Sequence, residues 1–223
     1  KQRLISDETW KVHASPNTLI GYWEAHHFGG EFYDASLEKP GWNTTGFDDT
    51  DWLQAKVYEP KIVVSADKTE PNRLVKEIKP LSVREISPGT YRVDMGINYA
   101  GWFEMRFDGQ PGDSIVFQFS ERENDTVSFG IHSIYKIGPI GEGKFCNRFN
   151  YMTGRWVQVS GLRSKPELKD IRGWLIRPDY QRIGGFECDI PLLNDIYNTT
   201  LWTFENLSLG NYVVDCPHRE RCG

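Results

Sequence analysis

This 223-residue sequence lacks three features that would indicate particular classes of protein: long apolar runs, closely paired cysteines and an excess of basic charge. Without a long apolar segment, the chain offers no candidate membrane-spanning helix. Its first residues also lack the apolar stretch of a signal peptide, so the sequence identifies no compartment. We therefore expect no membrane partner.

The cysteines are few, and no two of them form a Cys-x-x-Cys pair. They are Cys146, Cys188, Cys216 and Cys222. This spacing argues against a disulfide framework and favours free thiols. It also argues against a knuckle-type zinc site, which needs closely spaced ligand pairs.

The charge balance is acidic, with 31 Asp and Glu against 26 Lys and Arg, a net charge of −5 and a pI of about 5.6. A nucleic-acid-binding surface requires a basic footprint, so we expect no nucleic acid as partner. No phosphate-binding loop is present between residues 61 and 180, and we predict no cofactor.

Aromatic residues, by contrast, are abundant, at 13% with eight tryptophans. Many of them lie beside turn residues, an arrangement that suits stacking against the apolar face of a sugar ring. The alternative is that they form the cores of β-sandwiches, and we favour it because aromatic side chains dominate core burial in general.

Residues 1–60 predict short β-strands separated by Gly, Asn and Asp turns, which is typical of a jelly-roll-like β-sandwich domain, here incomplete. His26 and His27 are expected in an exposed loop rather than as ligands or sugar contacts. The acidic segment 48–51 offers oxygen ligands for calcium but lacks the spacing of an EF-hand loop, so we interpret it as a solvated turn.

Residues 61–184 predict a second β-sandwich domain. The prolines of segment 61–90 indicate a connector with one or two edge strands. Apolar residues then alternate with polar ones in 102–107 and again in 115–119, and we predict that these two stretches form an antiparallel pair. The glycine-rich segment 124–143 is expected to be a loop, and strands are expected to resume at 155–159 and 170–176.

Residues 185–223 change character and predict an amphipathic helix. Asp189 is a candidate N-cap with Pro191 in the first turn, and apolar residues recur at helical spacing for about four turns. The apolar positions are Leu192, Leu193, Ile196, Tyr197, Leu201 and Phe204. One such helix cannot bury its apolar face alone, so we predict that it is the first helix of a larger helical domain and that its exposed face promotes self-association.

The final segment, 215–223, holds the densest chemistry of the chain. Pro217 stiffens it, and a stiff loop of ionisable groups suits an active site. Cys216, His218 and Cys222 are residue types that zinc accepts, but the two neighbouring arginines would repel a cation. We predict packing and positioning roles for these three residues and no metal.

Several segments together resemble bacterial α-L-rhamnosidases of glycoside hydrolase family 78. Segment 91–102 is similar to the family's Asp-Phe-Gly-Gln-Asn-x-x-Gly-Trp stretch, and segment 149–161 to its Phe-Tyr-x-Gly-Phe-Arg-Tyr-x-x-Val-x-Gly stretch. Segments 30–35 and 47–52 look like the preceding jelly-roll-like domain. Segment 215–221, Asp-Cys-Pro-His-Arg-Glu-Arg, matches the motif that opens the family's catalytic (α/α)₆ barrel. Cys222 departs from the family, where Leu is usual.

The resemblance implies a fold and a set of roles. The fold is mainly β: two β-sandwich (jelly-roll-like) domains followed by the first helix of an (α/α)₆ barrel. Glu220 corresponds to the general acid and Asp215 to a residue that binds sugar hydroxyls, and we assign Arg219 to substrate binding as well. The implied partner is a rhamnose-containing oligosaccharide or glycoside.

Family members invert the anomeric configuration, which requires an acid and a second carboxylate that activates water. The resemblance places that second carboxylate downstream of the segment present here. Arg219 and Arg221 flank Glu220 and favour its ionised form, so Glu220 suits the acid role only if these arginines pair with other carboxylates such as Asp215. From the residues alone, Glu220 is also compatible with a surface salt bridge. The alternative function is a non-catalytic carbohydrate-binding or interaction module.

Overall fold

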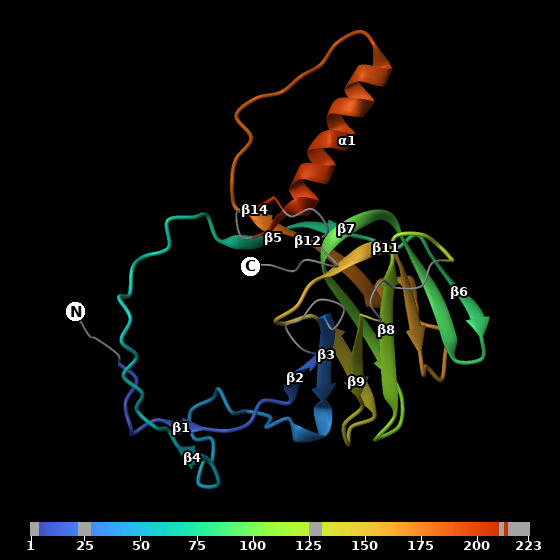
Figure 1. The fold of residues 1–223 in the computed structure, drawn as a ribbon. Helices are drawn as coiled ribbons and strands as arrows, with labels where there is room; N and C mark the ends of the chain where they lie inside the picture. Colours follow the sequence, from blue (N-terminus) through green and yellow to red (C-terminus); the bar gives the residue numbers. More distant parts are fainter. Residues whose placement is uncertain (1–4, 22–27, 125–130, 210–211, 214–223) are drawn as a thin grey trace.

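The computed structural model describes residues 5–21, 28–124, 131–209 and 212–213. Within them the chain is mainly β-strand with one long α-helix, as predicted (Figure 1). The helix is not long and apolar enough to cross a membrane, nor is any other helix of the described residues. The division of the chain into domains at residues 60 and 184 stays a prediction.

One sheet contains ten of the strands. In sheet order they are β2 (Asn17–Gly21), β3 (Phe28–Asp34), β9 (His132–Lys136), β8 (Ser114–Ser120), β11 (Met152–Ser160), β7 (Thr90–Asp108), β12 (Ile171–Pro178) and β5 (Asn72–Ile78), with β6 (Ser82–Ser87) and β10 (Glu142–Cys146) also paired to β7. Two-residue strands pair separately: β1 (Lys11–Val12) with β4 (Leu53–Gln54), and β13 (Ser208–Leu209) with β14 (Tyr212–Val213). Short 3₁₀ helices lie at Ala35–Leu37 and Leu168–Asp170.

The 19-residue strand β7 organises this sheet. Its first part, residues 90–94, pairs with β6 and with β11. Residues 99–101 also pair with β11, and the last part, residues 102–108, pairs instead with β12 and β10. Segment 61–90 supplies the edge strand β5 as well as β6, in agreement with the connector and edge strands predicted there.

The predicted pairing of segments 102–107 and 115–119 is wrong. Strand β8 pairs with β9 and β11, and the later part of β7 pairs with β10 and β12. The two segments instead pack face to face: the Phe103 ring lies 6.0 Å from Phe117 and 5.5 Å from Phe119 between centroids. The alternation that we identified is confirmed, because its apolar members all point into the core. They are Phe103, Met105, Phe107, Ile115, Phe117 and Phe119.

The predicted loop at 124–143 is also partly wrong, because it contains β9 and the start of β10. Strand β9 spans only five residues, in which the buried Ser133 and Tyr135 alternate with half-buried positions. Its pairing with β8 and β3 gives it the hydrogen bonds that the short, polar sequence does not signal.

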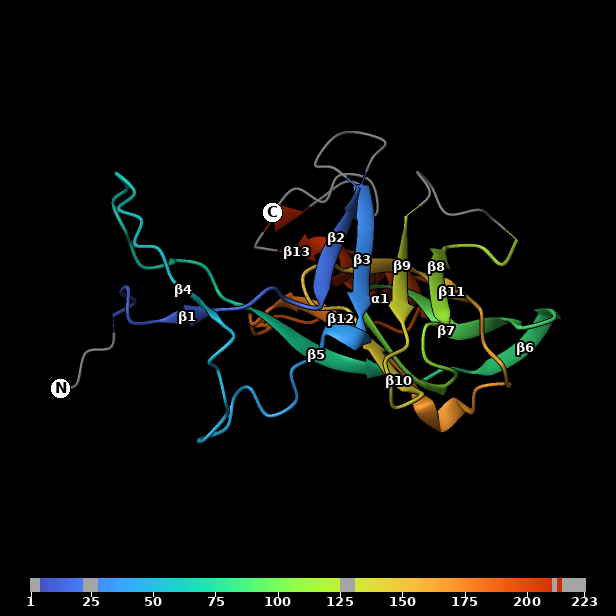
Figure 2. The same ribbon diagram turned by 90° about the horizontal axis from the view of Figure 1, so that it is seen from below.

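Strands β2 and β3 join the ten-stranded sheet through a parallel pairing of β3 with β9 (Figure 2). The approach is close: a Cβ added to Gly30 would lie 1.9 Å from the carbonyl oxygen of His132, so a side chain at this position would force the two strands apart. Residues 28–34 are therefore fixed to the central strands, although more than 90 residues separate them in sequence.

Helix α1 (Pro191–Leu207) begins one residue later than predicted, because Ile190 and not Asp189 is its N-cap, without a side-chain capping bond. Pro191 occupies the first turn as expected. Figure 1 shows that α1 projects away from the sheet and meets it only near its C-terminal end. Four apolar residues of the predicted face remain exposed: Leu192, Leu193, Ile196 and Phe204.

Candidate functional site

The residues with the strongest sequence signal, Asp215, Arg219 and Glu220, lie outside the described residues. The same holds for Cys216, His218 and Cys222, and for His26 and His27. The structure therefore leaves their roles as predictions. It does describe helix α1, which precedes the motif, and the side chains on the surface of the sheet.

The C-terminal end of α1 is attached to β7 by hydrogen bonds. The Asn206 Oδ1 atom accepts from the backbone N–H of Ala100 at 2.6 Å, and the Trp202 Nε1–H donates to the carbonyl of Asn98 at 2.8 Å. The ammonium of Lys76 lies 4.7 Å from the centroid of the Trp202 ring. These contacts fix the helix end from which the chain continues toward residue 215.

A buried carboxylate reinforces this attachment. Glu205 is buried, and its Oε1 atom lies 2.8 Å from Arg182 Nη2 and 3.5 Å from Arg177 Nε. Arg177 belongs to β12 and also donates to the carbonyls of Pro178 and Tyr180. Because a buried carboxylate is costly without partners, this pair of arginines holds α1 against β12.

Near β2 and β3 an open cleft of about 710 Å³ has aromatic walls. We call it the aromatic cleft; its rings are Tyr33, Trp42, Trp52 and Phe149. Trp42 and Phe149 are largely exposed, and the Trp52 Nε1 and Asn17 Oδ1 atoms are buried without a hydrogen-bond partner among the described residues. Our sequence analysis did not identify this cleft, because residues that are far apart in the sequence build it.

Glu31 fixes one wall of the aromatic cleft. Its side chain is 1% exposed and accepts hydrogen bonds from the backbone N–H groups of Arg148 (2.9 Å to each oxygen), Phe149 (3.0 Å) and Asn150 (2.8 Å). Asn17 Nδ2 donates to the same carboxylate at 3.2 Å. One acidic side chain thus joins β3 to the loop that carries Phe149.

In the part of the chain that the structure describes, no group of three or more His, Cys, Asp or Glu could hold a metal ion, and the set Cys216, His218 and Cys222 lies outside these residues. In the acidic segment 48–51, Asp49 pairs with Lys11 at 2.7 Å and Asp51 with Lys39 at 2.9 Å. Cys146 and Cys188 are free thiols, and burial raises the pKa of Cys146 to about 11.

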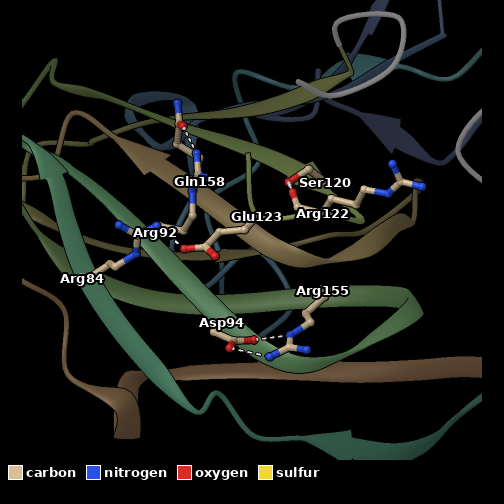
Figure 3. Close-up of polar contacts among 8 residues, drawn as sticks. All are labelled: Arg84, Arg92, Asp94, Ser120, Arg122, Glu123, Arg155 and Gln158. Atoms are coloured by element: carbon tan, nitrogen blue, oxygen red, sulfur yellow. Dashed lines mark hydrogen bonds and ion pairs between the residues drawn. The ribbon is translucent and has the colours of Figure 1, made fainter. Parts of the chain in front are cut away.

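A second polar cluster lies on the outer face of strands β6, β7, β11 and β8 (Figure 3). Here Arg155 donates to both oxygens of Asp94, at 2.7 and 2.8 Å, and its guanidinium lies 5.0 Å from the centroid of the Trp156 ring. The hydrogen bond from Arg155, together with one from the N–H of Gly96, holds the pKa of Asp94 below its usual value. Arg84 forms an ion pair with Glu123 in the same cluster.

Three family models match the chain in succession. Residues 1–76 match the α-L-rhamnosidase N-terminal domain, residues 84–177 match the bacterial α-L-rhamnosidase concanavalin-like domain, and residues 181–223 match the bacterial α-L-rhamnosidase six-hairpin glycosidase domain. The last match includes the motif at 215–221.

Curated relatives carry the same description. An α-L-rhamnosidase of Formosa agariphila is 30% identical over 237 residues, which cover 100% of this chain and 24% of the relative. An α-L-rhamnosidase of Streptomyces avermitilis is 28% identical, with 100% of this chain and 22% of the relative covered. The chain thus spans about a quarter of the length of these relatives.

Solved structures agree over nearly the whole chain. The α-L-rhamnosidase from Dictyoglumus thermophilum has a TM-score of 0.84 at 29% identity, and the alignment covers 96% of this chain and 25% of that one. The Streptomyces avermitilis α-L-rhamnosidase, complexed with L-rhamnose, has a TM-score of 0.84 at 26% identity and covers 98% and 22%.

Proposed function

Because this chain belongs to the bacterial α-L-rhamnosidase family, we propose that it is the β-rich portion and the first part of the catalytic domain of an inverting glycoside hydrolase that acts on terminal α-L-rhamnosides. The observation that carries the proposal is the match of residues 181–223 to the glycosidase domain, with Asp215, Arg219 and Glu220 in its opening motif. The rhamnose-bound Streptomyces relative supports rhamnose as the sugar.

In this proposal Glu220 protonates the leaving-group oxygen, while Asp215 and Arg219 hold the sugar. Inversion also needs a second carboxylate, placed to activate water on the opposite face of the ring. The proposed part of the β-rich portion is to hold α1, which precedes the motif, through its contacts with Trp202, Glu205 and Asn206.

The function is tested in a polypeptide of the relatives' length that carries this segment. Glu220→Gln is expected to lower kcat toward an aryl α-L-rhamnoside about 10²–10⁴-fold, because the amide cannot supply the proton. The control is Glu187→Gln, an exposed residue that precedes α1, which should leave kcat unchanged. The 223-residue polypeptide alone should not hydrolyse the aryl α-L-rhamnoside, because the family resemblance places the water-activating carboxylate downstream of these residues. Robust hydrolysis by that polypeptide, or an unaffected Glu220→Gln variant, would contradict the proposal.

A second candidate function is a non-catalytic carbohydrate-binding module, and the aromatic cleft favours it. Its rings offer apolar faces for sugar stacking, while Trp52 Nε1 and Asn17 Oδ1 are unpaired polar atoms beside them. Calorimetry with rhamnose-containing oligosaccharides separates the candidates. Binding that survives deletion of residues 185–223 and is lost in Trp42→Ala would support the module, whereas loss on deletion would assign binding to the C-terminal motif.

We further propose that the 223-residue polypeptide associates through the apolar face of α1. Ile196, for example, is 53% exposed, and contiguous exposed apolar surface promotes association. Sedimentation velocity should show concentration-dependent association that the double variant Leu192→Gln/Ile196→Gln suppresses. The polar-face control Asn198→Gln should associate like the parent chain, and a monodisperse parent monomer at high concentration would exclude this interface.

A further inference from the structure

Four long polar side chains form a straight row across the outer face of the sheet. The strand register places Arg84 of β6 opposite Arg92 of β7, Arg92 opposite Gln158 of β11, and Gln158 opposite Gln118 of β8. The residues that alternate with them point into the core; they include Val83, Val93, Val157, Val159, Phe117 and Phe119. We call these four outward-facing residues the arginine row.

The charges within the arginine row are unbalanced. Like charges directly opposite each other on antiparallel strands are destabilising, yet Arg84 faces Arg92. Arg92 has no carboxylate within ion-pair distance among the described residues. Its Nη2 donates to the neutral Gln158 Oε1 at 3.0 Å, and its Nε is buried without a partner. The nearby Asp94 does not compensate, because both of its oxygens already accept from Arg155.

A carboxylate already approaches one end of the row. Glu123, which follows β8, forms an ion pair with Arg84, and Figure 3 shows the Arg84 guanidinium directed toward it. Both side chains of this pair are well exposed, at 52% and 42%. Exposed pairs of this kind contribute little stability, so a ligand carboxylate can replace Glu123 at small cost.

The other end of the row carries neutral hydrogen-bonding groups. Gln158 Nε2 donates to Gln118 Oε1 at 3.3 Å, a long bond, and both amides are only partly buried. Amide groups of this kind can donate to and accept from hydroxyl groups. The row therefore combines a cationic end, suited to bidentate recognition of a carboxylate, with an end suited to a polyhydroxylated ring.

We propose that the arginine row is a binding subsite for an acidic sugar, in which Arg84 and Arg92 bind the carboxylate of a uronic acid residue and Gln158 and Gln118 bind its hydroxyls. The anion is assigned from the row itself, whereas the choice of a sugar over another carboxylate rests on the proposed function. The subsite shares no residue with the aromatic cleft or with the motif at 215–221.

The test is titration of the 223-residue polypeptide with methyl β-D-glucuronide, monitored by NMR of backbone amides at constant ionic strength. Shifts should concentrate on β6, β7 and β11, and Arg84→Gln and Arg92→Gln should each weaken binding on the order of tenfold or more. Glu123→Gln should strengthen binding, because it removes the competing carboxylate. Arg73→Gln, an exposed arginine of β5, changes the net charge equally and should have no effect.

Two further ligands make the assignment falsifiable. Methyl β-D-glucoside, which lacks the carboxylate, should not bind, and acetate should bind much more weakly than the glucuronide. Equal responses to glucuronide and glucoside would overturn the arginine assignment, and equal responses to glucuronide and acetate would overturn the sugar assignment. Binding of L-rhamnose elsewhere, without any response to the glucuronide at the row, would overturn this inference and leave the proposed function standing. Arg84 is exposed enough that its variant should fold even if Arg92→Gln does not.

Discussion

Replacing Glu31 with alanine is expected to lower the free energy of unfolding by about 3–5 kcal/mol, because each hydrogen bond to a charged group contributes about 1.5–3 kcal/mol and several donors lose their acceptor together. The Glu31 carboxylate accepts from three consecutive backbone N–H groups, those of Arg148, Phe149 and Asn150. In the alanine variant these part-buried donors lose their partner. The loop at 147–150 should then separate from β3.

Urea denaturation followed by far-UV circular dichroism and tryptophan fluorescence measures this change. Glu31→Gln should be destabilised less than the alanine variant, because its amide keeps one acceptor oxygen but turns an NH₂ group toward the same donors. Glu38→Ala is the matched control: Glu38 follows the same strand but is exposed and bonds only the Tyr33 hydroxyl in the described part of the chain, at 2.7 Å. A Glu31→Ala variant as stable as the Glu38→Ala variant would refute the proposed role.

Phe117→Ala is expected to destabilise the fold by a similar amount, about 3–5 kcal/mol, through the cavity that it leaves. Phe117 is fully buried and stacks on Phe145 with the ring centroids 4.2 Å apart. It also contacts Phe103 and Phe107 of β7, both at 6.0 Å between centroids. Because the Phe117 ring contacts side chains of β7 and β10, its removal should loosen the packing of β8 against both of these strands.

The control for this prediction is Phe149→Ala, which removes the same side chain at a position that is 76% exposed. That variant should unfold within about 1 kcal/mol of the parent, as surface substitutions usually do. Thermal unfolding should rank the parent and Phe149→Ala together, well above Phe117→Ala. A small effect of Phe117→Ala would mean that the aromatic cluster repacks without a cavity.

Sequence periodicity predicted the faces of the strands but not their neighbours. The alternation at Phe103, Met105 and Phe107 depends only on which side of a strand is buried, and the structure confirms it. Which strand lies beside which depends on contacts between distant segments. The six residues from Asp108 to Asp113 can close a hairpin or lead from one layer of the fold to the other, and a local pattern does not distinguish these two outcomes.

The missed elements have local causes as well. Strand β9 is short and mostly polar, with His132, Ser133 and Lys136 among its five residues, and the glycines on both sides of it in the sequence favoured a loop. Asp189 has the residue type of an N-cap, yet the helix begins after Ile190, where the Pro191 ring fixes the backbone for the first turn.

The candidate sites also differ in whether the sequence alone could reveal them. A contiguous motif such as 215–221 is visible in sequence, whereas the aromatic cleft joins residues near 13, 40 and 149 and is not. A weak signal for Glu31 did exist: an acidic residue between two glycines and two aromatic residues. The backbone groups that donate to its carboxylate lie more than 115 residues away, so no spacing rule could have identified them.

Among the described residues, the hydrogen bonds and ion pairs that attach helix α1 to the sheet lie near its C-terminal end, at Trp202, Glu205 and Asn206. A rod fixed in this way has its smallest displacements at the attachment and its largest at the opposite tip, here near Pro191. The chain beyond Leu207 therefore continues from the end of the helix at which the smallest displacements are expected. A change in the 179–190 connection, such as an insertion, is therefore expected to displace the N-terminal end of α1 more than the end at Leu207.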